Sequence, residues 1–128
     1  MPGARRDERG AAVADFAMVS VLVLVIVLAV LQLGLALHAR NTLISCASEG
    51  ARAGARADAV PGQAVARTEE LVSASLSPRY ARSVSSREAV VDGVRVVEVR
   101  VVAPVPVLGL LGPEGSIDVV GRAFAEDQ

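Results

Sequence analysis

The chain has 128 residues, a formal net charge of −1 and a hydrophobic fraction of 52%. Its length suits one small domain, and its high hydrophobicity excludes a disordered chain. The even charge balance gives no case for a surface that binds nucleic acid, which needs a clustered basic excess. One cysteine and one histidine exclude an internal disulfide and a metal site built from several such residues.

An apolar run without a charge covers residues 16–37. As a helix it is about 33 Å long, enough to cross a hydrocarbon core of roughly 30 Å. It exceeds the apolar region of a secretory signal, and so short a chain could not bury a helix that is apolar on every face. The sequence predicts a single-pass anchor in the cytoplasmic membrane. Three arginines before the run against three within twenty residues after it favour a cytoplasmic N-terminus only slightly, and the small size of the N-terminal side favours this orientation more.

A short charged leader ends at Gly10, and an acid, Asp15, stands directly before the apolar run. From its position alone, Asp15 suits an ordinary acid at the membrane interface. The order of residues also resembles the processing site of type IV prepilin-like proteins, which a membrane aspartyl peptidase cuts after the glycine. The resemblance implies that cleavage makes Ala11 the N-terminus, and that its ammonium group pairs with Asp15 of a neighbouring subunit.

Four stretches extend this likeness: RGAAVADFAMV at 9–19, LQLG at 31–34, SEGARAGARA at 48–57, and VRVVAPVPVLGLLGPEG near the C-terminus. Together they resemble the TadE family of pilus-assembly proteins, minor pseudopilins of tight-adherence (Flp pilus) systems. The resemblance implies a role in biogenesis of a type IVb/Flp-type pilus. The implied partners are the membrane, a prepilin peptidase, other pilins or pseudopilins, and the assembly machinery.

The chain departs from the family pattern at two places. Asp15 stands where the family usually has Glu, and its shorter side chain reaches about one methylene less far towards a neighbouring N-terminus. Ser20 and Val21 stand where the family often has a proline. The apolar run is therefore predicted to form a helix without a proline kink.

The helix is predicted to continue beyond the membrane to about residue 57, since no proline occurs between residues 2 and 61. Gly50, Ala51 and Gly54 fall on one side of it at three- and four-residue spacing. Such a smooth side permits close helix packing, against either the chain's own head or a neighbouring pseudopilin. A solvated helix with an alanine-rich composition is the alternative interpretation.

Three other residues of this helix have polar or reactive side chains: His38, Arg40 and Cys46. His38 and Arg40 flank the membrane exit and are interpreted as interfacial anchors. Cys46 either forms a disulfide with a second copy of the chain or serves as a small buried apolar residue.

A second, amphipathic helix is predicted over residues 62–76, after Pro61 ends the first. Its apolar stripe contains Val65, Thr68, Val72 and Leu76, with Leu71 beside it. A short helix with one such stripe must pack on another element.

From about residue 82 the valine pattern predicts a hairpin with a two-residue turn at Asp92-Gly93. In that register Arg87 faces Glu98 as a favourable cross-strand pair. Val97, Val99 and Val101 share the face expected to form the core, although Glu88 falls opposite Val97.

A third strand is predicted over residues 116–125, with Gly121 as a possible bulge. The apolar residues Val107, Leu108, Leu110 and Leu111 precede it and are expected to contact the outer leaflet, a partner or the head's own helix. The fold class is therefore α+β: a long membrane helix continuing outside, a short amphipathic helix and a small antiparallel sheet of about three strands.

These elements give three parts: a charged leader (1–10), a transmembrane and extended helix (11–58), and a small extracytoplasmic head (59–128). No catalytic constellation, phosphate loop or carboxylate pair stands out, so no enzyme, cofactor, metal, nucleic acid or small-molecule substrate is expected. The leading hypothesis is a membrane-anchored pilus-assembly protein. The alternatives are an unprocessed, membrane-anchored binding module and a pseudopilin of a secretion system.

Overall fold

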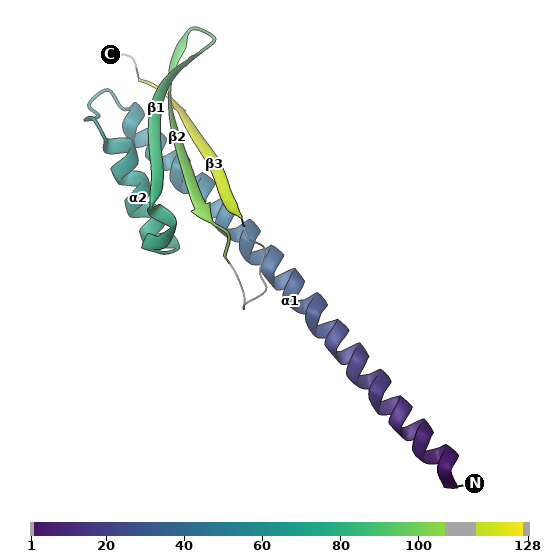
Figure 1. Ribbon diagram of the computed structural model, residues 1–128. Helices are drawn as coiled ribbons and strands as arrows, with labels where there is room; N and C mark the ends of the chain where they lie inside the picture. The colour runs from purple at the N-terminus through teal and green to yellow at the C-terminus, as the bar shows by residue number, and fades with distance from the viewer. Residues whose placement is uncertain (1, 107–114, 127–128) are drawn as a thin grey trace. The chain divides into compact units, whose positions relative to one another are not determined.

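The computed structural model describes residues 2–106 and 115–126 (Figure 1). The elements in chain order are α1 (Pro2–Ala55), α2 (Gln63–Ser75), the 3-10 helix η1 (Pro78–Ala81), β1 (Ser83–Val91), β2 (Val94–Pro104) and β3 (Ser116–Phe124). The chain forms two compact units, Met1–Gly34 and Leu35–Gln128, so the boundary falls within α1. From here on, "head" means this whole second unit, which includes the second half of α1 in addition to residues 59–128. The predicted α+β class is confirmed.

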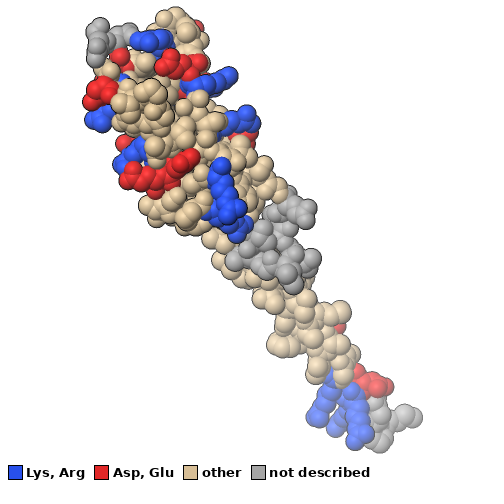
Figure 2. Space-filling model, turned by 60° about the vertical axis from the view of Figure 1, so that its left-hand side comes forward, with Lys and Arg blue, Asp and Glu red and all other residues tan. Residues whose placement is uncertain are grey.

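The first unit is a single stretch of α1 whose large apolar side chains are exposed. Its helical hydrogen bonding continues through Ser20 and Val21, as the absence of proline predicts. The helix is long and apolar enough to cross a membrane, and its most apolar window is entirely unburied. Figure 2 shows the charged atoms of this unit gathered towards its N-terminal end. This unit fits a single-pass membrane anchor.

The head contains a three-stranded antiparallel sheet in the order β1-β2-β3. The predicted hairpin is confirmed: Val91 pairs with Val94, and Arg87 pairs with Glu98. Asp92 and Gly93 have φ angles of 52° and 81°. Two consecutive residues with positive φ form the turn type whose twist matches that of the flanking strands, and an Asp-Gly sequence adopts it readily.

Gly121 is not a bulge, and that expectation from the sequence is wrong. It pairs with Val99 within an unbroken β2–β3 register. A Cβ on Gly121 would lie 2.3 Å from both the carbonyl carbon of Ala47 and the nitrogen of Ser48. Glycine is therefore required because the backbone of α1 approaches the backbone of β3 too closely for any side chain.

Helix α2 begins at Gln63, one residue later than expected, because Gly62 has a φ of 83° and lies in the left-handed region. Its buried residues are Ala64, Thr68 and Val72. Val65, expected on the apolar stripe, is only half-buried. The buried residue at this point of the helix is Ala64 and not Val65. The small side chain of Ala64 lies close to Gly54 of α1.

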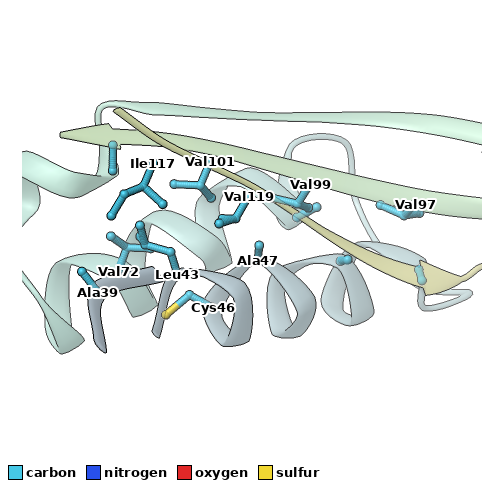
Figure 3. Packing of buried hydrophobic residues seen from close by; sticks show 14 residues of the cluster. Ala39, Leu43, Cys46, Ala47, Val72, Val97, Val99, Val101, Ile117 and Val119 are labelled. Atoms are coloured by element: carbon cyan, nitrogen blue, oxygen red, sulfur yellow. The ribbon is translucent and has the colours of Figure 1, made fainter. Parts of the chain in front are cut away.

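The core lies between one face of the sheet and two helices, the second half of α1 and α2 (Figure 3). Its fully buried large apolar side chains come from the sheet and from both helices: Leu43, Val72, Val99 and Val101. Val97 is also buried, so the predicted core face of β2 is confirmed. Burying each such side chain contributes about 1.5–3 kcal/mol, so the second half of α1 is a structural part of the head.

Candidate functional site

Gly10, Ala11 and Asp15 lie within the first unit, on the uninterrupted helix α1, and all three are exposed. Apart from its chain neighbours and the nearby backbone of its own helix, no atom of the described residues lies within 4 Å of the position that a Cβ on Gly10 would occupy. Ala11 and Asp15 are four residues apart and therefore share one side of the helix. The structure places these residues close together on an open surface and shows no side chain packed over Gly10.

Gly50, Ala51 and Gly54 lie in the head, where the small side of α1 contacts α2. A Cβ on Gly50 would lie 1.7 Å from Oγ1 of Thr68, and one on Gly54 would lie 2.6 Å from Cβ of Ala64. Ala51 is fully buried. This side of α1 is therefore covered by the chain's own second helix.

Thr68 shows why a polar residue is tolerated at this contact. Its side chain is fully buried, and its hydroxyl donates a hydrogen bond of 2.8 Å to the backbone carbonyl of Ala64. The hydroxyl is therefore satisfied within its own helix, since a buried donor without a partner would be costly. Thr68 and Gly50 together let the two helix backbones come close.

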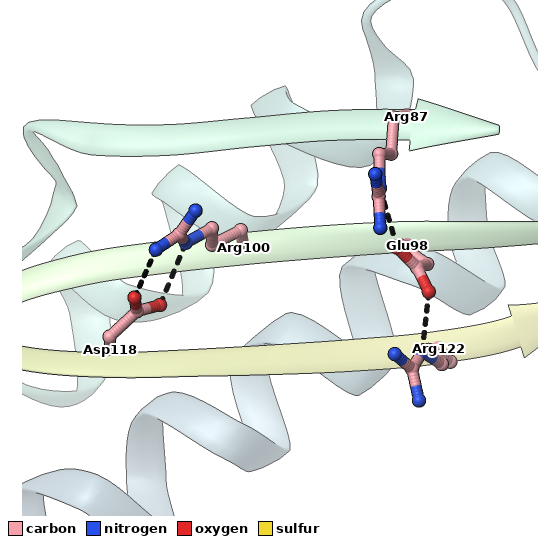
Figure 4. A network of polar contacts seen from close by, with 5 residues as sticks. All are labelled: Arg87, Glu98, Arg100, Asp118 and Arg122. Atoms are coloured by element: carbon pink, nitrogen blue, oxygen red, sulfur yellow. Dashed lines mark hydrogen bonds and ion pairs between the residues drawn. The ribbon is translucent and has the colours of Figure 1, made fainter. Parts of the chain in front are cut away.

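The opposite face of the sheet carries a charge network (Figure 4). Glu98 of β2 accepts hydrogen bonds of 2.6 Å from Nε of Arg87 on β1 and from Nε of Arg122 on β3. Arg100 donates two hydrogen bonds to Asp118, that from its Nε measuring 2.8 Å. Each strand is thereby joined to its neighbour by an ion pair as well as by its backbone.

These ion pairs shift the titration of both carboxyl groups. Hydrogen bonds from Arg87 and Arg122 hold the pKa of Glu98 below its usual value, and those from Arg100 do the same for the pKa of Asp118. The Glu98 side chain is only 7% exposed, although it lies on the uncovered face, because the two arginines flank it. Of these pairs, the sequence predicted only Arg87–Glu98; the others required the register of β3.

Cys46 is buried and reduced. Burial raises the pKa of its thiol, and a hydrogen bond with Ser75 partly opposes that rise. A buried thiol is unavailable for a cross-link, so the structure favours the small buried apolar residue over the cross-link to a second copy. His38 and Arg40 are exposed at the start of the head.

Within residues 2–106 and 115–126, no group of three or more His, Cys, Asp or Glu side chains could hold a metal ion. In the same part of the chain, no buried side-chain nitrogen or oxygen lacks a hydrogen-bond partner. The expectation for Val107, Leu108, Leu110 and Leu111 falls outside the described residues. The candidate functional features in the described part of the chain are its surfaces and the exposed segment around Gly10.

Residues 10–52 match the family model described as TadE-like protein. The matched segment begins at Gly10 and covers the apolar run together with Gly50 and Ala51, but not Gly54. The match supports the TadE-like resemblance over these residues and stops before α2. No curated protein and no solved structure matches the chain.

Proposed function

We propose that this chain, TadE-like over residues 10–52, is a minor pseudopilin that acts in the assembly of a type IVb/Flp-type tight-adherence pilus. The family association indicates involvement in pilus assembly. The observation that carries the proposal is the start of the family match at Gly10, at the end of the charged leader. The match begins one residue before Ala11, which would be the N-terminus of the chain after processing there.

The backbone at Gly10 is exposed and could be reached by a peptidase. The leader and the apolar run form one helix, and a peptidase must unwind that helix to hold an extended backbone. Gly10 weakens an exposed helix by about 1 kcal/mol relative to alanine. Because nothing packs within 4 Å of its Cβ position, local unwinding disrupts no side-chain contact with Gly10.

Processing would change the charge at the membrane edge. Arg5, Arg6 and Arg9 leave with the leader, so Asp15 becomes the acid nearest to a new ammonium group on Ala11. In a low-dielectric setting, two opposite charges on neighbouring subunits favour one axial register, because an unpaired charge there is costly. This proposed pairing with Asp15 would align the helices of adjacent subunits.

The proposed location is the cytoplasmic membrane, with the N-terminus cytoplasmic and the head extracytoplasmic. In this location the exposed apolar side chains of the first unit face lipid or neighbouring pilin helices. The head then supplies a folded surface to the pilus or to its assembly machinery. The role is structural, and the proposed interactions with a prepilin peptidase and other pilins need no cofactor.

The proposal is tested in cells that contain an active prepilin peptidase. Gly10→Val should block processing, so that the mature N-terminus Ala11 is lost. Asp15→Ala should leave processing intact and reduce pilus assembly, whereas Asp15→Glu should restore it. Assembly by a chain that keeps its leader would contradict the processed-pseudopilin function and favour an unprocessed anchored module.

A pseudopilin of a secretion system is the second candidate, since a processed anchor would suit it equally. Deletion of the gene distinguishes the two functions. Loss of surface pili with normal protein secretion supports the proposed role. Loss of secretion with normal pili would overturn it.

A further inference from the structure

The apolar run ends at Leu37, within the head, and contacts inside the head fix which elements lie at that end of it. Gly50 contacts Thr68, and Gly54 contacts Ala64. Contacts that advance along α1 therefore step back along α2, so the two helices are antiparallel. The end of α2 accordingly lies near Cys46, which is hydrogen-bonded to Ser75. The 3-10 helix η1 follows α2, and the same antiparallel register puts it near the level of Arg40.

Four residues at this end form what we call the collar: Arg40, Arg79, Tyr80 and Arg82. The three arginines are exposed, and none of them forms an ion pair within the described chain. Five other arginines of the head are each paired with a carboxylate: Arg52, Arg67, Arg87, Arg100 and Arg122. The collar is therefore a site of uncompensated positive charge.

The sequence around the collar contains no acid. Residues 38–48 and 71–87 include neither Asp nor Glu. In Figure 2 the lowest charged side chains of the head are blue. The acid that the sheet brings level with the start of β1, Asp118, is paired with Arg100.

Tyr80 gives the collar an amphipathic component. It is half-buried and packs against the head's core, while the guanidinium carbon of Arg79 lies 5.6 Å from the centroid of its ring. Tyrosine and arginine together are typical of side chains at a membrane–water interface.

The height of the collar suits the headgroup layer. Arg40 follows Leu37, the last residue of the apolar run, by three positions. Three residues of helix rise about 4.5 Å, and the polar layer on each side of a bilayer is roughly 5–7 Å thick. Arg40, and η1 near its level, would therefore fall among lipid headgroups if α1 spans the membrane.

We propose that the collar docks on the anionic phospholipid headgroups of the membrane that α1 crosses, and so sets the head's orientation on that membrane. The proposal rests on the membrane anchoring of α1 and not on leader processing. Positive charge without partners, an interfacial tyrosine and direct continuity with the apolar run together favour a lipid surface over a protein partner. On a vesicle that contains anionic lipid, each arginine near the surface favours the docked state by about five-fold.

The chain offers a single-site probe for this docking, because Tyr80 is the one tyrosine and no tryptophan is present. The full chain is reconstituted in phosphatidylcholine vesicles with or without phosphatidylglycerol and with a spin label on the lipid headgroup. We expect stronger quenching of Tyr80 emission in the anionic vesicles, and a decrease of that difference as salt is added.

The variant Arg79→Gln/Arg82→Gln should lose most of the dependence on anionic lipid. Arg56→Gln is the matched control: Arg56 is also exposed and also without an ion pair in the described chain, but it follows the far end of α1. Tyr80 emission in Arg56→Gln should be quenched to the same extent as in the wild type. Thermal unfolding followed by Tyr80 emission verifies that both variants fold.

Vesicle flotation separates the two levels of failure. A chain that floats but is quenched equally in both lipids, or whose double variant behaves like the wild type, overturns the collar and leaves the anchor intact. A chain that does not float overturns the membrane anchoring and, with it, the collar.

Discussion

The two units use the same residue type in opposite ways. Val23, in the first unit, is 53% exposed, whereas Val99, in the head, is fully buried. In the head, valines alternate along a strand and meet two helices; in the first unit, they cover every side of one helix. Apolar residues thus stabilise the head through its own core, while in the first unit they are suited to a surrounding apolar medium.

The same substitution in the two units should have different consequences. Val99→Asp places a carboxylate in the core and should unfold the head, with a loss of more than about 4 kcal/mol. Val23→Asp should leave head unfolding unchanged but disfavour membrane insertion by about 2.5–3.5 kcal/mol. Tyr80 emission during thermal unfolding in detergent measures the first effect, and flotation measures the second. Equal effects of both variants on head unfolding would contradict the division of roles.

The glycines provide the next comparison. Gly121→Ala puts a Cβ against the backbone of α1 and should destabilise the head by roughly 1–3 kcal/mol or more, because backbone atoms cannot move aside cheaply. Gly34→Ala, with nothing within 4 Å, is the control and should not alter head unfolding. A head that tolerates Gly121→Ala at full stability would show that the α1–β3 approach is not required.

We propose that Gly50 acts through helix packing, and its substitution should have a smaller effect than that of Gly121. Gly50→Ala should destabilise the head by about 1–2 kcal/mol, because the added Cβ would meet the Thr68 hydroxyl and the backbone oxygen of Ala64, so the helices must separate slightly and Thr68 loses its hydrogen bond. Adding Thr68→Ala should recover part of the stability, as measured in a double-mutant cycle. Strict additivity of the two effects would contradict a direct contact.

Stability of the head should also depend on pH through the charge network. Arginine hydrogen bonds lower the pKa of Glu98 in the folded state, so its contribution is complete above the unfolded value, about 4.3, and is lost as the pH falls through the lowered folded value. Asp118 acts in the same direction. The midpoint temperature of thermal unfolding should decrease as the pH is lowered below about 5. Glu98→Gln should make this decrease smaller.

The control for this pH dependence is Glu88→Gln on the same hairpin. Glu88 is exposed and forms no ion pair in the described chain. Its substitution should leave the pH profile of the wild type unchanged. A profile that Glu88→Gln flattens as much as Glu98→Gln does would contradict the assignment to the network.

The smallest effect is expected at Cys46. Because its thiol is buried and its pKa is raised, alkylation by iodoacetamide should be slow in the folded chain and rapid after unfolding. Cys46→Ala should change head stability little. Rapid alkylation under native conditions, or disulfide-linked dimers in membranes, would contradict its burial.

The features predicted from the sequence are those that local chemistry determines. A long apolar run has few alternatives to a membrane helix, and Asp92-Gly93 fixed both the turn and the pairing of Arg87 with Glu98. The roles of Gly121 and Ala64 depend on how closely two elements approach, which no local pattern encodes. For the same reason Glu98 was predicted with one arginine and has two: the second comes from β3, whose register only the folded sheet defines.

The most direct test of the central claim is the intact mass of the wild-type chain from native membranes that contain an active prepilin peptidase. The account predicts a chain that begins at Ala11 and has lost the ten residues up to Gly10. A chain that still carries Arg5, Arg6 and Arg9, in cells where other pilins are processed, would contradict the claim that this protein is a processed pseudopilin.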